Sequence, residues 1–252
     1  MVDEADRMMD LGFEAQLRSI ISKLPSRQSV FFSATWPPRV QKLVKDFSQR
    51  PVTVSCGTTA NKKVTQKVVV CTELEKRQLF FEWLEKLPEL ETKILVFVET
   101  RRAAEALCKQ LRYEQYSARS LHGDRDQQER QQVLESFRSG ECQILVATDV
   151  AQRGLDIKDV NYVVNYSMPK TIEDYVHRIG RTGRAGASGT AVSFLSSDFR
   201  ASESVRLAKG LVKAMEDAHQ APPEPLLRLA KSDSVRLRQA LSRGEGLGFP
   251  HQ

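Results

Sequence analysis

The chain has 252 residues, of which 40% are apolar and 28% charged, a composition typical of a globular protein with one large domain or two smaller ones. Lysine and arginine (38) outnumber aspartate and glutamate (32), and the net charge of +6 favours a polyanionic partner. The four cysteines form no C-x-x-C pair and the four histidines are scattered, which argues against a structural zinc site. Three of the cysteines lie among apolar residues, which favours reduced thiols in the nucleus or cytoplasm. No apolar run reaches the roughly 18 residues that span a bilayer, so we expect no membrane segment.

The first 55 residues predict two helices and two short strands. Apolar residues at helical spacing predict a helix over 13–24, and a second helix follows Pro37 and Pro38, which suit a first helical turn. Short β-rich runs predict strands at 29–33 and 51–55. At residues 56–67 the pattern lapses into Gly, Thr, Asn and Lys, which predicts a linker.

Strands and helices alternate regularly after the linker. The strands are predicted at 67–72, 93–98, 117–121, 143–148, 161–166 and 189–195, and the helices between them at 75–87, 101–113, 127–138 and 171–179. Because the strands are nearly continuous apolar runs, we expect a mostly parallel sheet covered by helices on both faces, in an α/β domain over 68–216 that a helix at 202–215 closes. We expect a mobile tail over 217–252 with one weak helix at 234–241.

The stretch from His177 to Arg184 contains three arginines and a histidine, with two glycines between the arginines. Glycine lets the backbone come close to a ligand, and the planar arginine side chain matches two oxygens of one phosphate. The stretch therefore predicts a helix end that faces an anion. A solvated basic face is the alternative.

Carboxylates and hydroxyls follow the predicted strands. Asp3, Glu4 and Asp6 come after one strand end, where carboxylates are suited to hydrated Mg²⁺ beside a triphosphate. Ser33 and Thr35 end the next strand. The alternatives are that helix N-termini attract acidic residues and that the hydroxyls form an ordinary helix cap.

In the second domain, the ends of two strands gather further polar residues. Thr148 ends one strand and leads to Arg153 and Asp156, while Gly123 and Asp124 follow another. Backbone N–H groups at such turns can receive phosphate oxygens, although a capped turn explains Gly123 and Asp124 equally well.

Taken together, the stretches 2–6, 32–35, 147–157 and 177–184 resemble the DEAD-box RNA helicases of superfamily 2, and 95–100 and 122–130 match the same family. The resemblance extends over residues 1–200. It implies an α/β fold in which a RecA-like parallel-sheet domain, the helicase C-terminal domain, follows the last part of a first RecA-like domain. It also implies an enzyme that couples hydrolysis of ATP with Mg²⁺ to RNA binding and local unwinding.

The resemblance assigns the nucleotide site residue by residue. Asp3 would hold Mg²⁺ through water, and Glu4 would position and deprotonate the attacking water. Arg181 and Arg184 would act as arginine fingers on the γ-phosphate. The remaining residues implied at the nucleotide are Asp6, Gly154 and Asp156.

The resemblance also implies RNA-binding and coupling residues. RNA phosphates would be gripped, without sequence preference, by Thr100, Arg101, Gly123, Thr148 and Arg153. The residues implied in coupling the two sites are Ser33, Thr35, His177, Arg178, Gln127 and Arg130. Phe97 is expected to support the arginine helix by packing rather than to touch a base.

The sequence departs from the family pattern in one respect, because no Gly-Lys pair occurs in it and the phosphate loop of the family is therefore missing. We expect an N-terminally incomplete chain that acts as a monomer and hydrolyses little ATP alone. Two alternatives stay open: a non-catalytic RNA- or partner-binding lobe, and a DNA helicase of related architecture. The upstream coding sequence would distinguish the first from a helicase fragment, and matched RNA and DNA duplexes would test the second.

Overall fold

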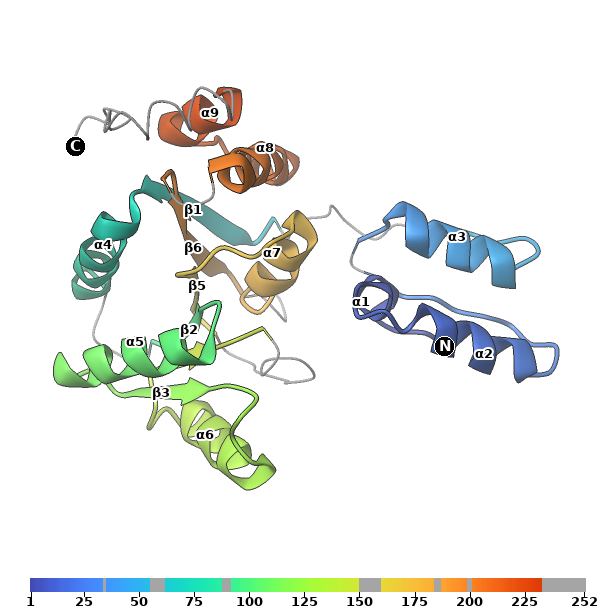
Figure 1. The fold of residues 1–252 in the computed structure, drawn as a ribbon, viewed down its shortest axis with the longest axis horizontal. Coiled ribbons are helices and arrows are strands. Elements are labelled where there is room, and N and C mark those ends of the chain that lie inside the picture. Colours follow the sequence, from blue (N-terminus) through green and yellow to red (C-terminus); the bar gives the residue numbers. More distant parts are fainter. Residues whose placement is uncertain are drawn as a thin grey trace. The chain divides into compact units, whose positions relative to one another are not determined.

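The computed structural model describes residues 1–33, 35–54, 62–87, 92–149, 160–183, 187–198 and 201–232 (Figure 1). The chain divides into two compact units, Met1–Thr59 and Ala60–Gln252. The division falls within residues 56–67, where the sequence predicts a linker. Each unit is described by itself.

The described residues of the first unit form three helices, α1 (Ala5–Asp10), α2 (Glu14–Lys23) and α3 (Pro38–Phe47). Pro38 occupies the first turn of α3, where its missing N–H group needs no partner. A small core holds the helices together, and its buried side chains are those of Ala5, Met9, Leu17, Val40, Leu43 and Val44.

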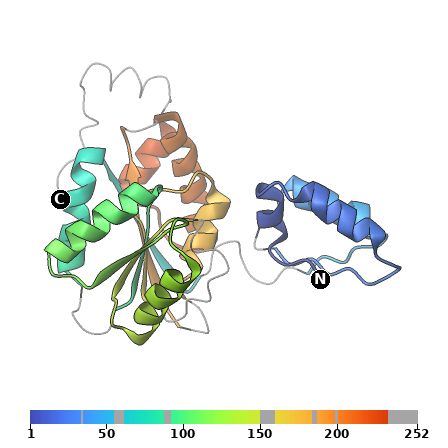
Figure 2. The same cartoon turned by 60° about the horizontal axis from the view of Figure 1, so that its bottom comes forward.

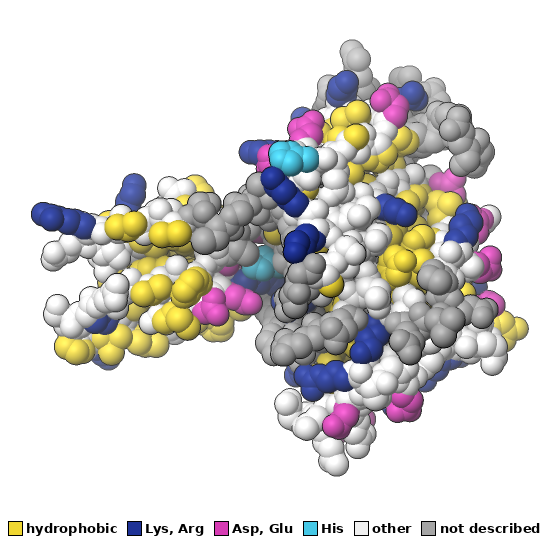
Figure 3. All heavy atoms as spheres, turned by 180° about the vertical axis from the view of Figure 1, so that it is seen from behind, with side chains coloured by type: hydrophobic (Ala, Val, Ile, Leu, Met, Phe, Trp, Pro, Cys, Tyr) yellow, Lys and Arg dark blue, Asp and Glu magenta, His cyan; other side chains and the backbone are white. Residues whose placement is uncertain are grey.

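Much of the apolar surface of this unit faces solvent, as the yellow side chains in Figure 3 show. Its large exposed apolar side chains include those of Leu11, Phe13, Ile20, Leu24, Val30 and Phe32. Contiguous exposed apolar surface is unfavourable in water. The first unit is therefore expected to be the less stable of the two.

Among the described residues of this unit, the two predicted strands do not form. A single parallel bridge joins Val2 to Phe31, with the Val2 N–H donating to the Val30 carbonyl at 2.8 Å, and residues 51–54 are irregular. A strand requires a hydrogen-bonded neighbour along its length. Among the described residues of this unit only the segment around Val2 offers one, so the β-rich composition alone was misleading.

The second unit contains one six-stranded sheet in which every pairing is parallel. The strand order is β1-β6-β5-β2-β4-β3. The strands are β1 (Val64–Cys71), β2 (Ile94–Phe97), β3 (Ala118–Leu121), β4 (Ile144–Ala147), β5 (Tyr162–Asn165) and β6 (Gly189–Ser196). The helices are α4 (Glu73–Glu85), α5 (Arg101–Tyr113), α6 (Gln127–Ser139), α7 (Ile172–Ile179), α8 (Ala201–Asp217) and α9 (Glu224–Lys231). The predicted α/β domain with a parallel sheet is confirmed.

Helices cover both faces of this sheet (Figure 2). Successive side chains of a strand point to opposite faces, so Val96 packs in the cluster with α4 and α5 while its neighbour Leu95 packs in the cluster with α6. On the side of α6, the helices α7, α8 and α9 pack against β1 and β6. Burial on both faces explains why the strands read as continuous apolar runs.

Capping side chains set the starts of the helices in this unit. Thr72 accepts the N–H of Glu75 while the Glu75 carboxylate accepts the N–H of Thr72, and this capping box starts α4 two residues before the predicted helix. Asp126 and Glu129 form the same arrangement at α6.

The first strand begins inside the predicted linker, at Val64 rather than at residue 67. Its register with β6 buries Gln66, whose side-chain oxygen accepts the hydroxyl of Tyr175 at 2.8 Å and whose backbone N–H donates to Gln220 at 2.7 Å. These partners satisfy the side-chain oxygen and the backbone N–H of Gln66, whereas its buried side-chain nitrogen has no hydrogen-bond partner among the described residues. The sequence pattern could not reveal the burial of this polar residue.

The predicted mobile tail is wrong for residues 224–231, which form α9. Leu226 and Leu229 of this helix are buried in the core cluster with α8, so packing against α8 orders the segment. The Pro-rich sequence before it suggested a break, yet Pro223 and Pro225 lie at the start of a helix, where proline is tolerated. The helix predicted at 234–241 lies outside the described residues.

Candidate functional site

Three of the predicted RNA-binding residues lie at one edge of the sheet in the second unit. The last residues of β2, β4 and β3 are neighbours in register, and Thr100, Thr148 and Gly123 follow these strands. The Thr100 hydroxyl accepts the N–H of Ala103 and so caps α5. Thr148 is buried, whereas Thr100 and Gly123 are exposed. The parallel topology therefore brings these residues together, as expected for strand ends of such a sheet.

Arg101 links two of the loops at this edge. Its guanidinium forms an exposed ion pair with the carboxylate of Asp124, next to Gly123. The pair fixes the start of α5 against the turn after β3. An exposed arginine of this kind keeps further N–H donors for an anion.

A polar cluster around Glu105 of α5 supports the same turn. The Oε1 atom of Glu105 on α5 accepts the Ser120 hydroxyl at 2.6 Å, lies 2.7 Å from Nε2 of His122 and accepts Nη2 of Arg125 at 3.3 Å. The hydrogen bond from Ser120 and the contacts with His122 and Arg125 lower the pKa of Glu105 below its usual value against the opposing effect of burial. One carboxylate thus anchors the turn that carries Gly123.

The other main polar cluster is centred on Arg178 of α7, which is only 2% exposed. Its Nε and Nη2 atoms donate to the two carboxylate oxygens of Asp149, each at 2.7 Å, and Nη1 donates to Asn165 at 3.0 Å and to the Ser167 carbonyl at 2.7 Å. The guanidinium lies 4.9 Å from the ring centroid of Phe97. Four of the five N–H groups of this guanidinium thus donate to protein atoms, and the side chain is almost fully buried, so Arg178 holds structure rather than an external anion.

These contacts agree with the expectation that Phe97 packs against the arginine helix. They also tie α7 to the ends of three strands, because Phe97 ends β2, Asn165 ends β5 and Asp149 follows β4. Helix α7 is consequently held at the same edge as the predicted RNA-binding residues.

The end of α7 is shaped by tight backbone packing. The helix ends at Ile179, and Arg181 follows two residues later with its N–H donating to the Arg178 carbonyl. Thr182 donates its hydroxyl to the Val160 carbonyl at 2.5 Å, and a Cβ atom at Gly189 would lie 2.0 Å from that hydroxyl oxygen. Glycine at 189 therefore lets the segment with Arg181 pack on the sheet.

In the first unit, Asp6 joins the two predicted motifs. Its Oδ2 atom accepts both the N–H and the hydroxyl of Thr35, at 3.0 and 2.6 Å, and its own N–H donates to the hydroxyl of Ser33 at 3.2 Å. Asp6 is buried, and its other oxygen accepts the N–H of Arg7. The implied link of Asp6 to Ser33 and Thr35 is therefore present, whereas its implied contact with a nucleotide stays a prediction.

Asp3 and Glu4 differ from Asp6 because both are exposed. They follow the bridge at Val2, and Oδ1 of Asp3 accepts the N–H of Glu4 at 2.9 Å. Glu4 adopts a left-handed backbone conformation (φ 49°), which is uncommon for a residue other than glycine. Their carboxylates are open to a hydrated cation, which fits the role predicted for Asp3.

The remaining predicted residues are only partly placed. Gln127 is the first residue of α6, Arg130 follows one turn later, and His177 lies half-buried on α7. Their coupling roles stay predictions. The other predicted site residues lie outside the described part of the chain, and these are Arg153, Gly154, Asp156 and Arg184.

Sequence reasoning assigned no role to Asp149, Asn165 or Glu105. A signal for Asn165 existed, because it is an amide at the end of an otherwise apolar strand, and such a buried polar group needs a partner. Asp149 directly follows Thr148 and was visible only as part of a strand end. Glu105 reads as one more exposed helix residue, and nothing in its pattern distinguishes it.

A parallel RecA-like sheet with an arginine-bearing helix at the carboxyl ends of its strands defines the C-terminal domain of a helicase. Comparison with known families agrees, since the model of the DEAD/DEAH box helicases matches residues 1–43 and that of the helicase conserved C-terminal domain matches residues 75–186. The chain belongs to the DEAD-box helicase family.

Curated relatives support this assignment. The ATP-dependent RNA helicases DBP2 of Candida glabrata and Saccharomyces cerevisiae are each 46% identical over 233 residues, covering 90% of this chain and 42% of the relative. The chain therefore spans less than half the length of these relatives.

Solved structures of the family are similar as well. The yeast DEAD-box splicing factor Prp28 has a TM-score of 0.62 and 32% identity, covering 92% of this chain and 53% of that chain. Saccharomyces cerevisiae Dbp5 bound to RNA and ADP BeF3 has a TM-score of 0.73 and 28% identity, covering 95% of this chain and 62% of that chain. Escherichia coli SrmB bound to the regulator of ribonuclease activity A has a TM-score of 0.52 and 37% identity, covering 58% of this chain and 87% of that chain.

Across the described residues, no helix combines the length and apolar character that a membrane span requires.

Proposed function

We propose that this chain is part of an ATP-dependent RNA helicase that couples ATP hydrolysis to RNA binding and local duplex unwinding. The observation that carries the proposal is the common edge of the second unit, where Thr100, Gly123 and Thr148 gather beside the helix that Arg178 anchors. The names of the DBP2 relatives point to the same activity.

The residues present fit part of an ATP and Mg²⁺ site. Bound ATP and Mg²⁺ would supply the transferable phosphoryl group and a cation that neutralises its charge. Asp3 would hold the cation through water, and Glu4 would orient the attacking water and accept its proton, since both carboxylates are exposed. Arg181 and Arg184 would neutralise the charge that develops on the γ-phosphate.

The sequence contains no Gly-Lys pair, so we expect this chain to lack the loop that would cradle the phosphates. We propose that the 252-residue chain alone hydrolyses negligible ATP. A second candidate, a non-catalytic RNA- or partner-binding lobe, is favoured by the same observation together with the complete six-stranded sheet of the second unit.

RNA would be held through its backbone by Thr100, Arg101, Gly123, Thr148 and Arg153. Contacts to phosphates and 2′-hydroxyls carry no sequence information, so binding would be independent of sequence. The proposal describes a monomer that acts on RNA in the nucleus or cytoplasm.

Fluorescence anisotropy with a labelled oligouridine tests RNA binding by the chain as it stands. We expect binding that weakens as salt rises, because phosphate contacts release counterions. Arg101→Ala should weaken it several-fold, whereas Arg112→Ala, which removes an exposed arginine near the other end of α5, should change it little. Equal effects of the two variants would contradict the assigned edge.

Hydrolysis is measured separately on the same preparation. Negligible phosphate release with and without RNA is expected, and robust RNA-stimulated hydrolysis would refute the proposed inactivity of the chain. RNA binding without hydrolysis, even after a phosphate-loop-bearing first domain is added, would favour the non-catalytic lobe.

A further inference from the structure

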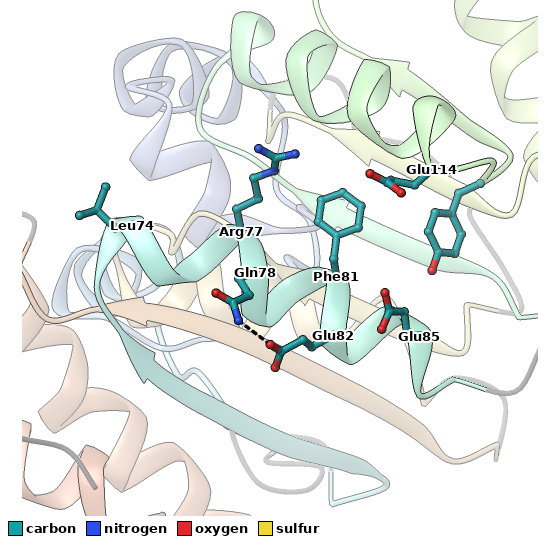
Figure 4. Close-up of a pocket in the computed structure, with 8 residues that line it drawn as sticks. Leu74, Arg77, Gln78, Phe81, Glu82, Glu85 and Glu114 are labelled. Atoms are coloured by element: carbon teal, nitrogen blue, oxygen red, sulfur yellow. Dashed lines mark hydrogen bonds between the residues drawn. The ribbon is translucent and has the colours of Figure 1, made fainter. Parts of the chain in front are cut away.

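A groove outside the proposed site runs along α4 (Figure 4). It has a volume of about 510 Å³ and lies between α4 and the segment that follows α5. Arg77, Phe81 and Glu85 line it from successive turns of α4, and Glu114 and Tyr116 line the opposite side. In Figure 4 the side chains of Phe81 and Glu85 project from α4 toward Glu114.

Aromatic rings form part of the groove wall. Phe81 and Tyr116 are both half-buried, and the ring of Phe81 packs edge-on against the buried ring of Phe80 at a centroid distance of 5.5 Å. The guanidinium of Arg77 lies 6.0 Å from the centroid of Phe81. An arginine of the chain itself thus already uses the face of this ring, which shows that the ring can receive a cation.

The rim of the groove is acidic although the chain as a whole carries a net charge of +6. Glu82, Glu85 and Glu114 contribute three carboxylates against the single guanidinium of Arg77. Glu82 accepts a hydrogen bond from Gln78 at 2.8 Å, whereas Glu85 and Glu114 make no ion pair among the described residues. Burial first, and then the charges of Glu85 and Glu114, raise the pKa of Tyr116, so both carboxylates act on its hydroxyl.

The groove has the length of a short peptide. Leu74 to Glu85 span about three helical turns, or roughly 16 Å. Leu74, a residue that is 92% exposed, lies at one end, and the carboxylates of Glu85 and Glu114 lie at the other. An occupant with an apolar side chain at one end and a cation at the other would match both ends.

We propose that this groove docks a short basic segment of a partner protein. An arginine of that segment would lie over the aromatic wall between Glu85 and Glu114, and an apolar side chain would pack on Leu74. Carboxylate pairing and the ring face both favour a guanidinium. RNA is disfavoured because its phosphates would meet three carboxylates. The proposal is independent of the helicase activity, since it uses another face of the second unit.

Fluorescence anisotropy with the full chain tests the groove directly. The probe is a labelled peptide with a leucine near one end and two arginines near the other, and its counterpart replaces both arginines with glutamate. We expect saturable binding of the arginine peptide and none of the glutamate peptide. The double variant Glu85→Lys and Glu114→Lys should weaken binding about tenfold or more, because two attractive pairs become repulsive.

A control double variant keeps the result specific. Glu135→Lys with Glu216→Lys makes the same change of charge on exposed residues of α6 and α8, outside the groove, and should alter affinity less than twofold. Equal loss in both double variants would show non-specific charge attraction and overturn the proposal. Unchanged affinity in the variant with lysine at both Glu85 and Glu114 would overturn it as well.

Two other occupants are outcomes of the same assay. Residues 233–252 of the chain contain three arginines, so the chain shortened to 1–232 is measured in parallel. If the shortened chain binds the arginine peptide with unchanged affinity, the result supports a partner segment. A tenfold gain in affinity would show that the chain's own tail occupies the groove, and it would overturn the proposal. A labelled oligouridine should bind the groove double variant and the control double variant with equal affinity, because both gain the same positive charge. A larger gain in RNA affinity in the groove double variant would mean that RNA contacts the groove, and it would overturn the proposal.

Discussion

Arg178 and Asp149 are joined by two parallel hydrogen bonds of 2.7 Å, with the arginine almost fully buried and the aspartate side chain one-third exposed. The pair connects the helix that leads to Arg181 with the loop that directly follows Thr148. This single ion pair would therefore link Arg181, which is proposed to face the nucleotide, with Thr148, which is proposed to face RNA.

Asp149→Ala should destabilise the second unit by about 3 kcal/mol, because it leaves the buried guanidinium of Arg178 without its countercharge. Urea denaturation followed by circular dichroism measures the change. Asp124→Ala, which breaks the exposed pair with Arg101, serves as the control and should cost about 1 kcal/mol or less. Equal costs would mean that burial of Arg178 does not determine the strength of the pair.

Glu105 should make the stability of the second unit depend on acidic pH. Its pKa is lowered from the usual value of 4.5, first by the hydrogen bond from Ser120. A carboxylate with a lowered folded-state pKa contributes stability above its unfolded pKa, and the contribution disappears as pH falls through the folded value. The difference in unfolding free energy between the parent chain and Glu105→Gln should thus shrink below pH 4.5. Glu135→Gln, on the exposed face of α6, should show no such trend.

The buried cysteines should resist alkylation in the folded chain. Burial raises the pKa of Cys71 to about 12 and that of Cys142 to about 11, and it also raises the pKa of Cys108. At mildly alkaline pH few of these thiols are ionised, and the thiolate is the reactive form. Iodoacetamide followed by peptide mass spectrometry should show little modification at these three sites, and full modification in denaturant. Rapid labelling of the folded chain would contradict the described burial.

Leu226→Ala should destabilise the second unit by about 2–4 kcal/mol, because Leu226 is fully buried between α9 and the core. Thermal unfolding provides the measurement. Arg228→Ala, on the exposed side of the same helix, should have an effect below about 1 kcal/mol. If both changes were neutral, α9 would not belong to the folded unit.

Limited proteolysis should remove the first unit before the second. The first unit has a small core and many exposed apolar side chains, whereas the second buries both faces of a complete sheet. Trypsin can cut in both units, so mass spectrometry of early fragments distinguishes them. Survival of residues 1–54 while residues 62–198 are digested would reverse this order of stability.

Several features of the fold could be predicted because they depend on local pattern. Apolar runs bounded by capping residues predicted the six strands and the helices between them, since burial on two faces requires such runs. The start of β1 was not predicted because Gln66 is polar. The burial of Gln66 depends on Tyr175, which is distant in sequence. The two short strands predicted in the first unit failed because pairing needs a neighbour that composition does not specify.

The sequence by itself determined the family, the alternation of strands and helices, and the types of residue proposed to meet phosphates, because these follow from short motifs and periodicity. The tertiary structure decided which polar residues meet. It paired Arg178 with Asp149, converged Ser120, His122 and Arg125 on Glu105, and buried Asp6 against Thr35. Such contacts depend on strand order and register, which bring residues far apart in the chain to one edge. For His177–Arg184 the fold showed that Arg178 braces the helix, a division of roles that residue type alone does not reveal.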